Sequence, residues 1–281
     1  MSLRQLLGDA VPSFIDQFYT KLPHSQASGA AALCELGSWE VLAKALQAPQ
    51  ADTMVVRRNQ RYDGPLPQSP DDAQRLVAEG YTLLVKHAER HDARLAALAA
   101  AFARDFATEV NIHMYCTPAE QYGFAWHYDA EEVFIVQTTG RKEYRLRKNT
   151  VNPWPIEETL PADMRYEREI MPLMQCELAA GDWLYIPSGY WHMGESRETA
   201  ISLAIGVQPR TGVDVFDFLR PRIVESLLWR QRLPVVGDAQ SEDAEARMAE
   251  VAKQLAQDIS KQITSPEVVR EFLRSLRQKC P

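Results

Sequence analysis

Residues 181–192 read GDWLYIPSGYWH, and this stretch decides the fold that the sequence predicts. It consists of a glycine turn, a short apolar strand, a Pro-Ser-Gly turn and then His192, which is presented at the strand end. Upstream, residues 127–129 read HYD, and strand alternation would place His127 and Asp129 on one face. Two imidazoles and one carboxylate form the facial ligand set of non-haem Fe(II) sites, which leaves coordination positions open. We therefore expect His127, Asp129 and His192 to bind one metal ion.

The segment around these motifs is rich in short strands separated by turn residues. The predicted strands cover residues 110–116, 134–137, 142–147, 176–178, 184–186 and 199–207. Such a series of short strands predicts an antiparallel barrel or jelly roll. Between them, residues 149–171 contain Pro153, Pro155 and Pro161 and are expected to form a long loop that decides the substrate.

Helical periodicity brackets this strand-rich segment on both sides. Before it, helices are predicted within residues 10–50 and at 71–79 and 95–106, with strands at 53–57 and 81–85. After Pro209, three segments carry apolar residues at helical spacing. The last of them is predicted to be a helix in which Ser265 is the cap and Pro266 lies in the first turn. The predicted fold is mainly β with flanking α: a jelly roll with N-terminal helices and a C-terminal helical segment.

The predicted C-terminal helices carry more apolar surface than packing within one small core can bury. Leu227, Leu228 and Trp229 follow one another directly within this region. Because large exposed apolar patches mark interfaces, we expect a homodimer that forms through this region.

Composition restricts the class of protein. The 281 residues are 46% hydrophobic and 25% charged, which is typical of a soluble globular protein, and the net charge of −7 argues against direct nucleic-acid binding. The spacing of the four cysteines fits neither a disulfide framework nor a zinc knuckle. The N-terminal residues lack a signal-peptide pattern, and no apolar run is long enough to span a membrane. We therefore expect a cytoplasmic protein without a membrane partner.

The other histidines are weaker candidates for metal binding. His24 lies beside a proline in a turn, and His87 and His91 are four residues apart but lack the glutamate that directly follows the first histidine in zincins. His113 lies in the middle of a predicted strand, where a hydrogen-bonded structural role is expected.

Several motifs of this sequence resemble those of a known protein family. Val110-Asn111 leading into Thr117-Pro118, then residues 127–137, 140–145 and 181–192, are similar to the cupin superfamily. Within it they resemble the JmjC-type Fe(II)/2-oxoglutarate hydroxylases, above all the ribosomal-oxygenase-like branch. The resemblance implies a catalytic core at residues 107–212, between N-terminal elements at 1–106 and a dimerising helical region at 213–281. It also implies that His127, Asp129 and His192 hold iron, and that a basic residue after the HxD motif anchors the distal carboxylate of 2-oxoglutarate.

Alternation in the strand at 142–147 supplies a candidate for that anchor. Lys142 shares one face with Tyr144 and Leu146, so it is expected to point inward. The opposite face is expected in water and comprises Arg141, Glu143, Arg145 and Arg147. A buried lysine needs an anion, which the dicarboxylate co-substrate would supply. A structural Lys–Glu pair is the alternative.

Two further features are compatible with a bound molecule. In residues 199–207 one face is bulky and the other small, with Ser202 on the small face as a possible polar contact; close strand or helix packing explains the pattern equally well. Trp126, Trp183 and Trp191 flank the expected ligands and could form the wall of a substrate pocket, although aromatic residues in short strands usually belong to a core.

The predicted activity is an Fe(II)- and 2-oxoglutarate-dependent dioxygenase that hydroxylates a C–H bond of a protein side chain or small molecule and releases succinate and CO2. One alternative is a cupin dioxygenase or isomerase that uses the metal without 2-oxoglutarate. Another is a non-catalytic cupin that binds a partner protein. Asp129 and an inward Lys142 favour the first.

Overall fold

The computed structural model describes residues 2–166, 170–234 and 242–278. The chain divides into two compact units, with the division between Pro209 and Arg210. The first unit contains all strands of the described chain and the cavity discussed below.

The strands form two antiparallel sheets. The major sheet has eight strands in the order β1-β9-β6-β11-β5-β4-β2-β3, and the minor sheet has three in the order β10-β7-β8. The strand bounds are β1 (His24–Gln26), β2 (Asp52–Arg57), β3 (Gln60–Arg61), β4 (Thr82–Lys86), β5 (Val110–Thr117), β6 (Glu132–Thr139), β7 (Lys142–Arg147), β8 (Met174–Leu178), β9 (Trp183–Ile186), β10 (Trp191–Ser196) and β11 (Ala200–Val207).

The predicted jelly roll with flanking helices is confirmed, and each predicted strand is present. His192 was expected at the end of a strand, and this was wrong: it is the second residue of β10, which pairs with β7. The sequence hides β10 because Gly194, Glu195 and Ser196 give it no alternating apolar pattern.

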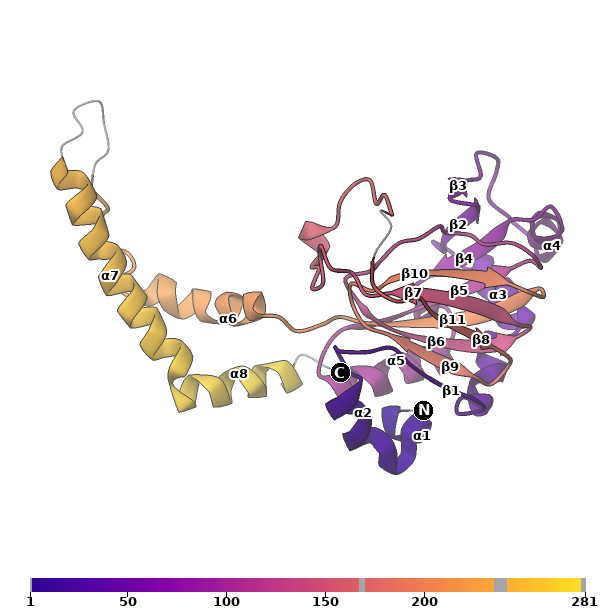
Figure 1. The fold of residues 1–281 in the computed structure, drawn as a ribbon, viewed down its shortest axis with the longest axis horizontal. Coiled ribbons are helices and arrows are strands. Elements are labelled where there is room, and N and C mark those ends of the chain that lie inside the picture. The colour runs from indigo at the N-terminus through magenta and orange to yellow at the C-terminus, as the bar shows by residue number, and fades with distance from the viewer. Residues whose placement is uncertain (1, 167–169, 235–241, 279–281) are drawn as a thin grey trace. The chain divides into compact units, whose positions relative to one another are not determined.

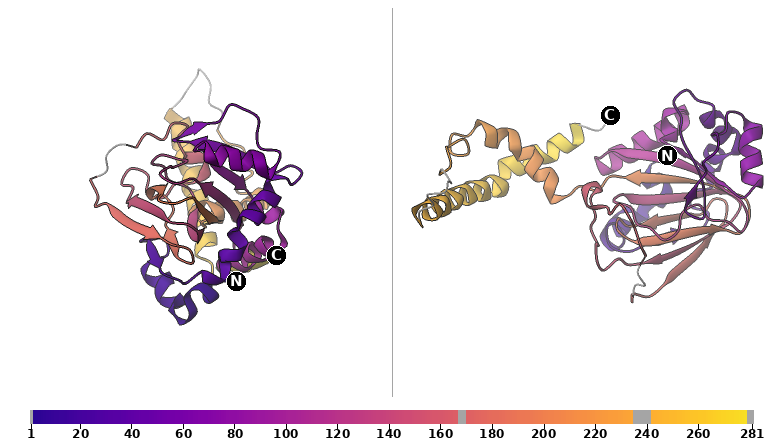
Figure 2. Two further views of the ribbon diagram at one scale, coloured as in Figure 1. Left: turned by 90° about the vertical axis from the view of Figure 1, so that its right-hand side faces the viewer. Right: turned by 90° about the horizontal axis from the view of Figure 1, so that it is seen from above.

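The N-terminal part of the chain extends the major sheet. β4 pairs with β5, and β2 pairs with β4, so the sheet continues across the expected boundary at residue 106. The helices of this unit are α1 (Leu3–Leu7), α2 (Val11–Gln17), α3 (Trp39–Leu46), α4 (Pro70–Ala78) and α5 (Ala93–Phe106). Figure 2 shows α1 and α2, in indigo, grouped at one edge of the strands.

Side chains of the major sheet pack on both of its faces. Phe102 of α5 and Phe14 of α2 share one core with Phe134 of β6 and Leu203 of β11. A smaller core lies between the two sheets and includes Leu146 of β7.

Strand alternation decides which side chains reach the space between the sheets. In β11, Leu203 and Ile205 belong to the helix-side core, whereas Ser202, Ala204 and Gly206 line a cavity. The predicted division of this strand into a bulky and a small face is therefore present, and the small face leaves the space open.

The second unit is helical, with α6 (Gly212–Glu225), α7 (Glu242–Thr264) and α8 (Pro266–Gln278). In Figure 1, α8 turns away from α7, and Ser265, the predicted cap residue, lies between the last residue of α7 and the first residue of α8. Phe218 of α6 packs against Phe272 of α8 with 5.3 Å between ring centroids. Within the described residues, no helix is both long and apolar enough to cross a membrane.

Candidate active site

Two glycine turns position His192. Gly181 precedes β9 and Gly189 follows it. Their φ angles of +92° and +80° lie in the left-handed region of backbone conformation, which favours glycine. A Cβ atom at Gly189 would lie 2.7 Å from the carbonyl oxygen of Pro153, so a larger residue does not fit there. The Gly189 amide also donates to the carbonyl of Asp129 at 2.9 Å, which ties the turn to the HxD motif.

His127 lies opposite His192 in an isolated antiparallel bridge. The His127 amide donates to the His192 carbonyl at 3.1 Å, and the His192 amide donates back at 2.8 Å. The HxD motif was expected to be a strand, which is wrong: Tyr128 and Asp129 have no ladder partner, and only His127 forms the bridge.

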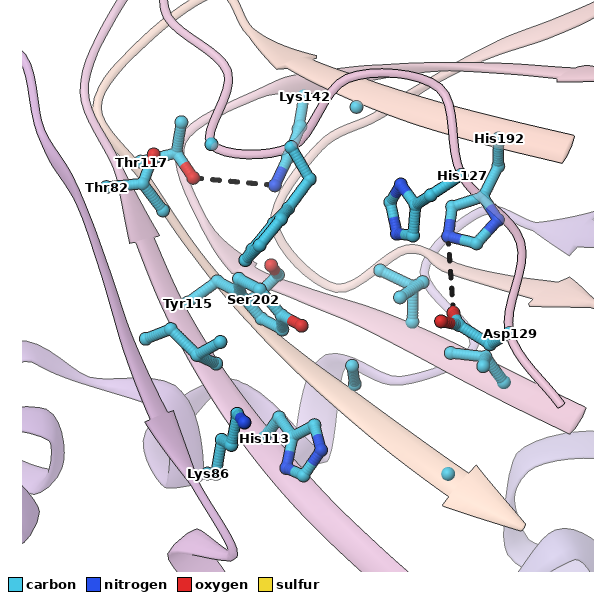
Figure 3. A pocket seen from close by; sticks show the side chains of 18 of the residues that line it. Thr82, Lys86, His113, Tyr115, Thr117, His127, Asp129, Lys142, His192 and Ser202 are labelled. Carbon is cyan, nitrogen blue, oxygen red and sulfur yellow. Dashed lines mark hydrogen bonds and ion pairs between the residues drawn. The ribbon is translucent and has the colours of Figure 1, made fainter. Parts of the chain in front are cut away.

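The three side chains converge on one point. His127, Asp129 and His192 each offer one ligand atom, and these three atoms lie within 4.8 Å of one another. The His192 Nε2 atom lies 3.5 Å from the Asp129 carboxylate, as Figure 3 shows. Among the described residues no other group of histidine, cysteine, aspartate or glutamate has this geometry.

Backbone carbonyls orient both imidazoles. The Nδ1 atom of His127 lies 2.8 Å from the Ala125 carbonyl oxygen, and that of His192 lies 3.0 Å from the Tyr190 carbonyl oxygen. Since a carbonyl only accepts, each Nδ1 carries the proton and each Nε2 lone pair remains available to a metal. Burial lowers the pKa of His192 to about 4, so this imidazole stays neutral, as a metal ligand must. The donor set, its tautomers and its protonation therefore fit a divalent transition metal.

Lys142 lies in the same cavity and is 8% exposed. Its Nζ atom is 3.5 Å from the Thr117 hydroxyl and lies 5.6 Å and 5.5 Å from the ring centroids of Tyr115 and Tyr144. Burial lowers the pKa of Lys142 to about 8. No ion pair of Lys142 occurs within the described part of the chain. The buried ammonium group therefore has a hydroxyl and two aromatic faces as neighbours but no anion.

Glu143, the residue next to Lys142, pairs with two arginines. It accepts hydrogen bonds from Arg145, at 2.7 Å, and from Arg197, at 2.5 Å. Glu143 was expected in water, which is wrong: it is 8% exposed because these two arginine side chains cover it. The structural Lys–Glu pair does not form.

Glycine makes room for the lysine. A Cβ atom at Gly194, on the neighbouring strand β10, would lie 2.8 Å from Lys142 Cε and equally close to the Tyr144 ring. Ser202 also lines the cavity, next to the Tyr144 hydroxyl, and faces Tyr115 across the β5–β11 pair.

The cavity has a volume of about 290 Å³. Besides the expected residues its lining includes polar side chains that sequence reasoning missed: Thr82, Lys86, Asn111, Tyr115, Thr117 and Glu131. Four of the cavity residues, at positions 111, 113, 115 and 117, alternate along β5 with buried apolar residues. This alternation is visible in the sequence, and it indicates that β5 has a polar face on the side of the cavity. His113 has the expected structural bond, since its Nδ1 accepts from the His87 amide at 3.2 Å, and it also lines the cavity (Figure 3).

The three tryptophans do not line this cavity. Trp183 is fully buried in the helix-side core and packs against Phe14. Trp126 stacks on Tyr166 at 4.5 Å between centroids, and Trp191 meets the same ring edge-on at 5.3 Å. Tyr166, from the long loop, therefore lies against the residues that directly precede His127 and His192.

Comparison with known proteins shows which family this chain is similar to. A family model described as the JmjC domain matches residues 83–215. The NO66 bifunctional lysine-specific demethylase and histidyl-hydroxylase of Drosophila yakuba is 27% identical over 202 residues, which cover 67% of this chain and 29% of the relative. Ribosomal oxygenase 1 of Gallus gallus is 31% identical over 155 residues, covering 50% and 26%. The chain thus spans less than a third of the length of these curated relatives.

A solved structure has the same fold. The Escherichia coli ribosomal oxygenase YcfD, in complex with cobalt and 2-oxoglutarate, superposes with a TM-score of 0.64 at 21% identity, covering 96% of this chain and 71% of YcfD. Residues 83–215 are therefore similar to the JmjC domain, in a chain that resembles the ribosomal oxygenases in sequence and shares its fold with YcfD.

Proposed function

We propose that this protein is an Fe(II)- and 2-oxoglutarate-dependent dioxygenase that hydroxylates a protein side chain. The observation that carries the proposal is Lys142, a buried ammonium group that has no anionic partner among the residues described and lies in the cavity that also holds the His127–Asp129–His192 cluster. The relatives named above as hydroxylases and oxygenases, and the binding of 2-oxoglutarate by YcfD, support the same activity.

His127, Asp129 and His192 would hold the iron and leave coordination positions open. When bound, iron and 2-oxoglutarate would supply, together with O2, the oxidising chemistry that converts a substrate C–H bond into an alcohol; one oxygen atom of O2 enters the alcohol and the other enters succinate, with release of CO2. The carbonyls of Ala125 and Tyr190 keep the imidazole Nε2 atoms directed at the metal position.

Lys142 would bind the distal carboxylate of 2-oxoglutarate. Burying one ammonium group without an anion is costly, and a carboxylate removes that cost. The Thr117 hydroxyl can share the same carboxylate, and Ser202 and Tyr144 border the space between Lys142 and the metal ligands. The faces of Tyr115 and Tyr144 keep water from the ammonium group.

We further propose that the protein is cytoplasmic and forms a homodimer through its helical unit. Cys34, Cys116 and Cys176 are free thiols, which fits a reducing compartment. Apolar side chains of the helical unit are exposed, among them Phe216, which is 56% exposed, and Leu227, which is 78% exposed. A second copy of this unit would cover such a surface. The loop at 149–171, whose Tyr166 contacts both histidine motifs, would contribute to substrate choice.

The decisive experiment measures 2-oxoglutarate consumption and succinate formation by NMR with Fe(II) and ascorbate, for wild type and Lys142→Met. We expect the Michaelis constant for 2-oxoglutarate to rise roughly ten- to a hundredfold in the variant, the cost of one hydrogen bond to a charged group. Lys148→Met removes the same charge from an exposed position of the next loop and serves as the control. Iron-dependent chemistry without 2-oxoglutarate would instead favour a metal-only cupin, and absence of iron binding would favour a binding module.

A further inference from the structure

Glu132 is a buried carboxylate on the apolar side of the major sheet. It is the first residue of β6, and strand alternation places it on the same side as Phe134, which belongs to the helix-side core. The next residues on the other side, Val133 and Ile135, line the cavity. Glu132 is only 2% exposed. Because a buried carboxylate is costly unless hydrogen bonds compensate, its partners indicate its role.

Two donors meet one oxygen of Glu132. The Tyr185 hydroxyl and the Ser188 amide both donate to its Oε2 atom, the amide at 3.2 Å. The Tyr185 hydroxyl in turn accepts a hydrogen bond from the Thr20 amide at 2.7 Å. The Tyr185 ring packs in the aromatic core, with 5.1 Å between its centroid and that of Phe14. The carboxylate is therefore fixed from the core side and presents its oxygen to the chain that follows β9.

This oxygen meets the turn Pro187–Tyr190, which connects β9 to β10. The Tyr190 amide donates to the Pro187 carbonyl at 3.1 Å and closes the turn. The Gly189 amide donates to the Asp129 carbonyl at 2.9 Å. Three successive amides of the turn thus have three different acceptors. Two of these are main-chain carbonyls, and the acceptor of the Ser188 amide is the side chain of Glu132.

The turn contacts two of the three proposed metal ligands. The Tyr190 carbonyl orients the His192 imidazole through its Nδ1 atom, at 3.0 Å, and the Gly189 amide holds the main chain of Asp129. A shift of the turn would therefore rotate one ligand and displace the other. Partners that lie behind metal ligands in this way set the tautomer and the direction of the donor atoms. Glu132 acts on the cluster through this turn, from the side of β6 that faces away from the cavity.

We propose that Glu132 is a positioning residue of the metal site, which fixes the Pro187–Tyr190 turn and through it the ligands His192 and Asp129. This inference rests on the proposed function, because that function assigns a metal to the cluster. The alternative is a carboxylate that only satisfies the Tyr185 hydroxyl and stabilises the core. The two roles differ in what happens to His192 when Glu132 is replaced.

Two substitutions separate the hydrogen bonds of Glu132 from its charge. Glu132→Gln loses the charge but keeps an oxygen that can accept from both donors. Glu132→Met has a side chain of similar length and is at most a weak acceptor. Thr138→Val is the control for a general loss of core stability. It removes a buried hydroxyl that donates to the Gly37 and Ile201 carbonyls, at 2.7 Å and 2.8 Å.

The first measurement needs no metal. In the metal-free full chain at pH 8, the 15N chemical shifts of the imidazoles identify the ring nitrogen that carries the proton. We expect His192 of wild type to carry it on Nδ1, because the Tyr190 carbonyl accepts there. Glu132→Met should transfer a measurable fraction of His192 to the tautomer with the proton on Nε2, whereas Glu132→Gln and Thr138→Val should not.

The second measurement is a Co(II) titration followed by visible absorption. Glu132→Met should bind Co(II) roughly ten- to a hundredfold more weakly than wild type, the usual effect of losing an outer-shell partner, and its absorption bands should change. Glu132→Gln should restore affinity and spectrum to near the wild-type values. Thr138→Val should lower the melting temperature and leave Co(II) binding unchanged.

Three results would overturn the positioning role. Wild-type tautomer and Co(II) affinity in Glu132→Met would mean that the backbone bridge between His127 and His192 is sufficient. Equal weakening in Glu132→Gln and Glu132→Met would assign the effect to charge and not to the hydrogen bonds. A tautomer shift of the same size in Thr138→Val would assign it to stability alone.

Amide hydrogen exchange of wild type decides the matter if Glu132→Met does not fold. A Ser188 amide that exchanges as slowly as the Gly189 amide supports the role of Glu132, and exchange at the rate of an unprotected amide refutes it. Absence of Co(II) binding to wild type would refute the proposed hydroxylase. The His192 tautomer, measured on metal-free protein, would still test the role of Glu132.

Discussion

His127 and His192 exchange both of their backbone amide hydrogen bonds although they belong to motifs far apart in the sequence. Their rings follow this pairing, with 4.2 Å between centroids, and each ring is held by a carbonyl two residues earlier in its own segment. The main chain thus sets the distance between the two proposed ligands, and the side chains add only the donor atoms.

This arrangement separates metal binding from folding. We expect His127→Ala and Asp129→Ala to weaken Co(II) binding by more than roughly a hundredfold, beyond the usual effect of losing an outer-shell partner. The melting temperature of the metal-free protein should change little, because the backbone bridge does not involve these side chains. Visible absorption of Co(II) and thermal unfolding measure the two quantities. His24→Ala, at a histidine outside the cluster, is the control, and intact Co(II) binding in either variant would remove these residues from the ligand set.

Gly194 offers a test of Lys142 that leaves the lysine itself in place. Gly194→Ala would put a methyl group 2.8 Å from Lys142 Cε, so the ammonium group must shift. We expect 2-oxoglutarate to bind up to roughly a hundredfold more weakly, as displacements of about 1 Å in a site can cost. Isothermal titration with Zn(II)-loaded protein checks this. Zn(II) affinity should stay at the wild-type value, and a parallel loss of both affinities would mean that the strand pair, and not Lys142, was disturbed.

Local sequence rules predicted one part of this site and missed another. Turn glycines brought forward His192, and strand alternation gave the inward direction of Lys142, because both depend on neighbouring residues. His127 and Asp129 were brought forward by the HxD motif, although the strand that was expected there does not form. Burial of Glu143 was missed because alternation gives the side of the sheet but not what covers it, and Arg197 comes from beyond another strand.

Contacts between distant segments explain the other omissions. Trp183 belongs to the core because Phe14, from an N-terminal helix, packs against it, which no pattern around Trp183 reveals. Glu131 is held by Asn111 and Gln208, and neither lies close to it in the sequence. Such partners become visible only when the sheet register is known.

His113 should make stability depend on pH. Burial lowers its pKa from 6.5 to about 4, so the unfolded chain binds more protons between these values and the folded state loses stability as the pH falls below 6.5. Between pH 8 and pH 5 this histidine alone should lower the free energy of unfolding by roughly 2 kcal/mol. Urea unfolding of metal-free protein at both pH values measures it. His113→Asn should reduce the pH dependence by that amount; an unchanged dependence in His113→Asn would contradict the assignment.

The helical unit provides the last prediction. Val269 and Leu273 lie four residues apart on one face of α8 and are 44% and 50% exposed, which is unfavourable for two apolar side chains unless a second copy covers them. We expect the wild-type chain to elute as a dimer at micromolar concentration, and the double variant Val269→Asp/Leu273→Asp to be a monomer with unchanged helix content. Light scattering coupled to size exclusion gives the masses, and circular dichroism gives the helicity. Arg270→Asp introduces an acidic residue on the same helix, next to Val269, and should leave the dimer intact. A monomeric wild type would mean that this face is covered by another partner or by none.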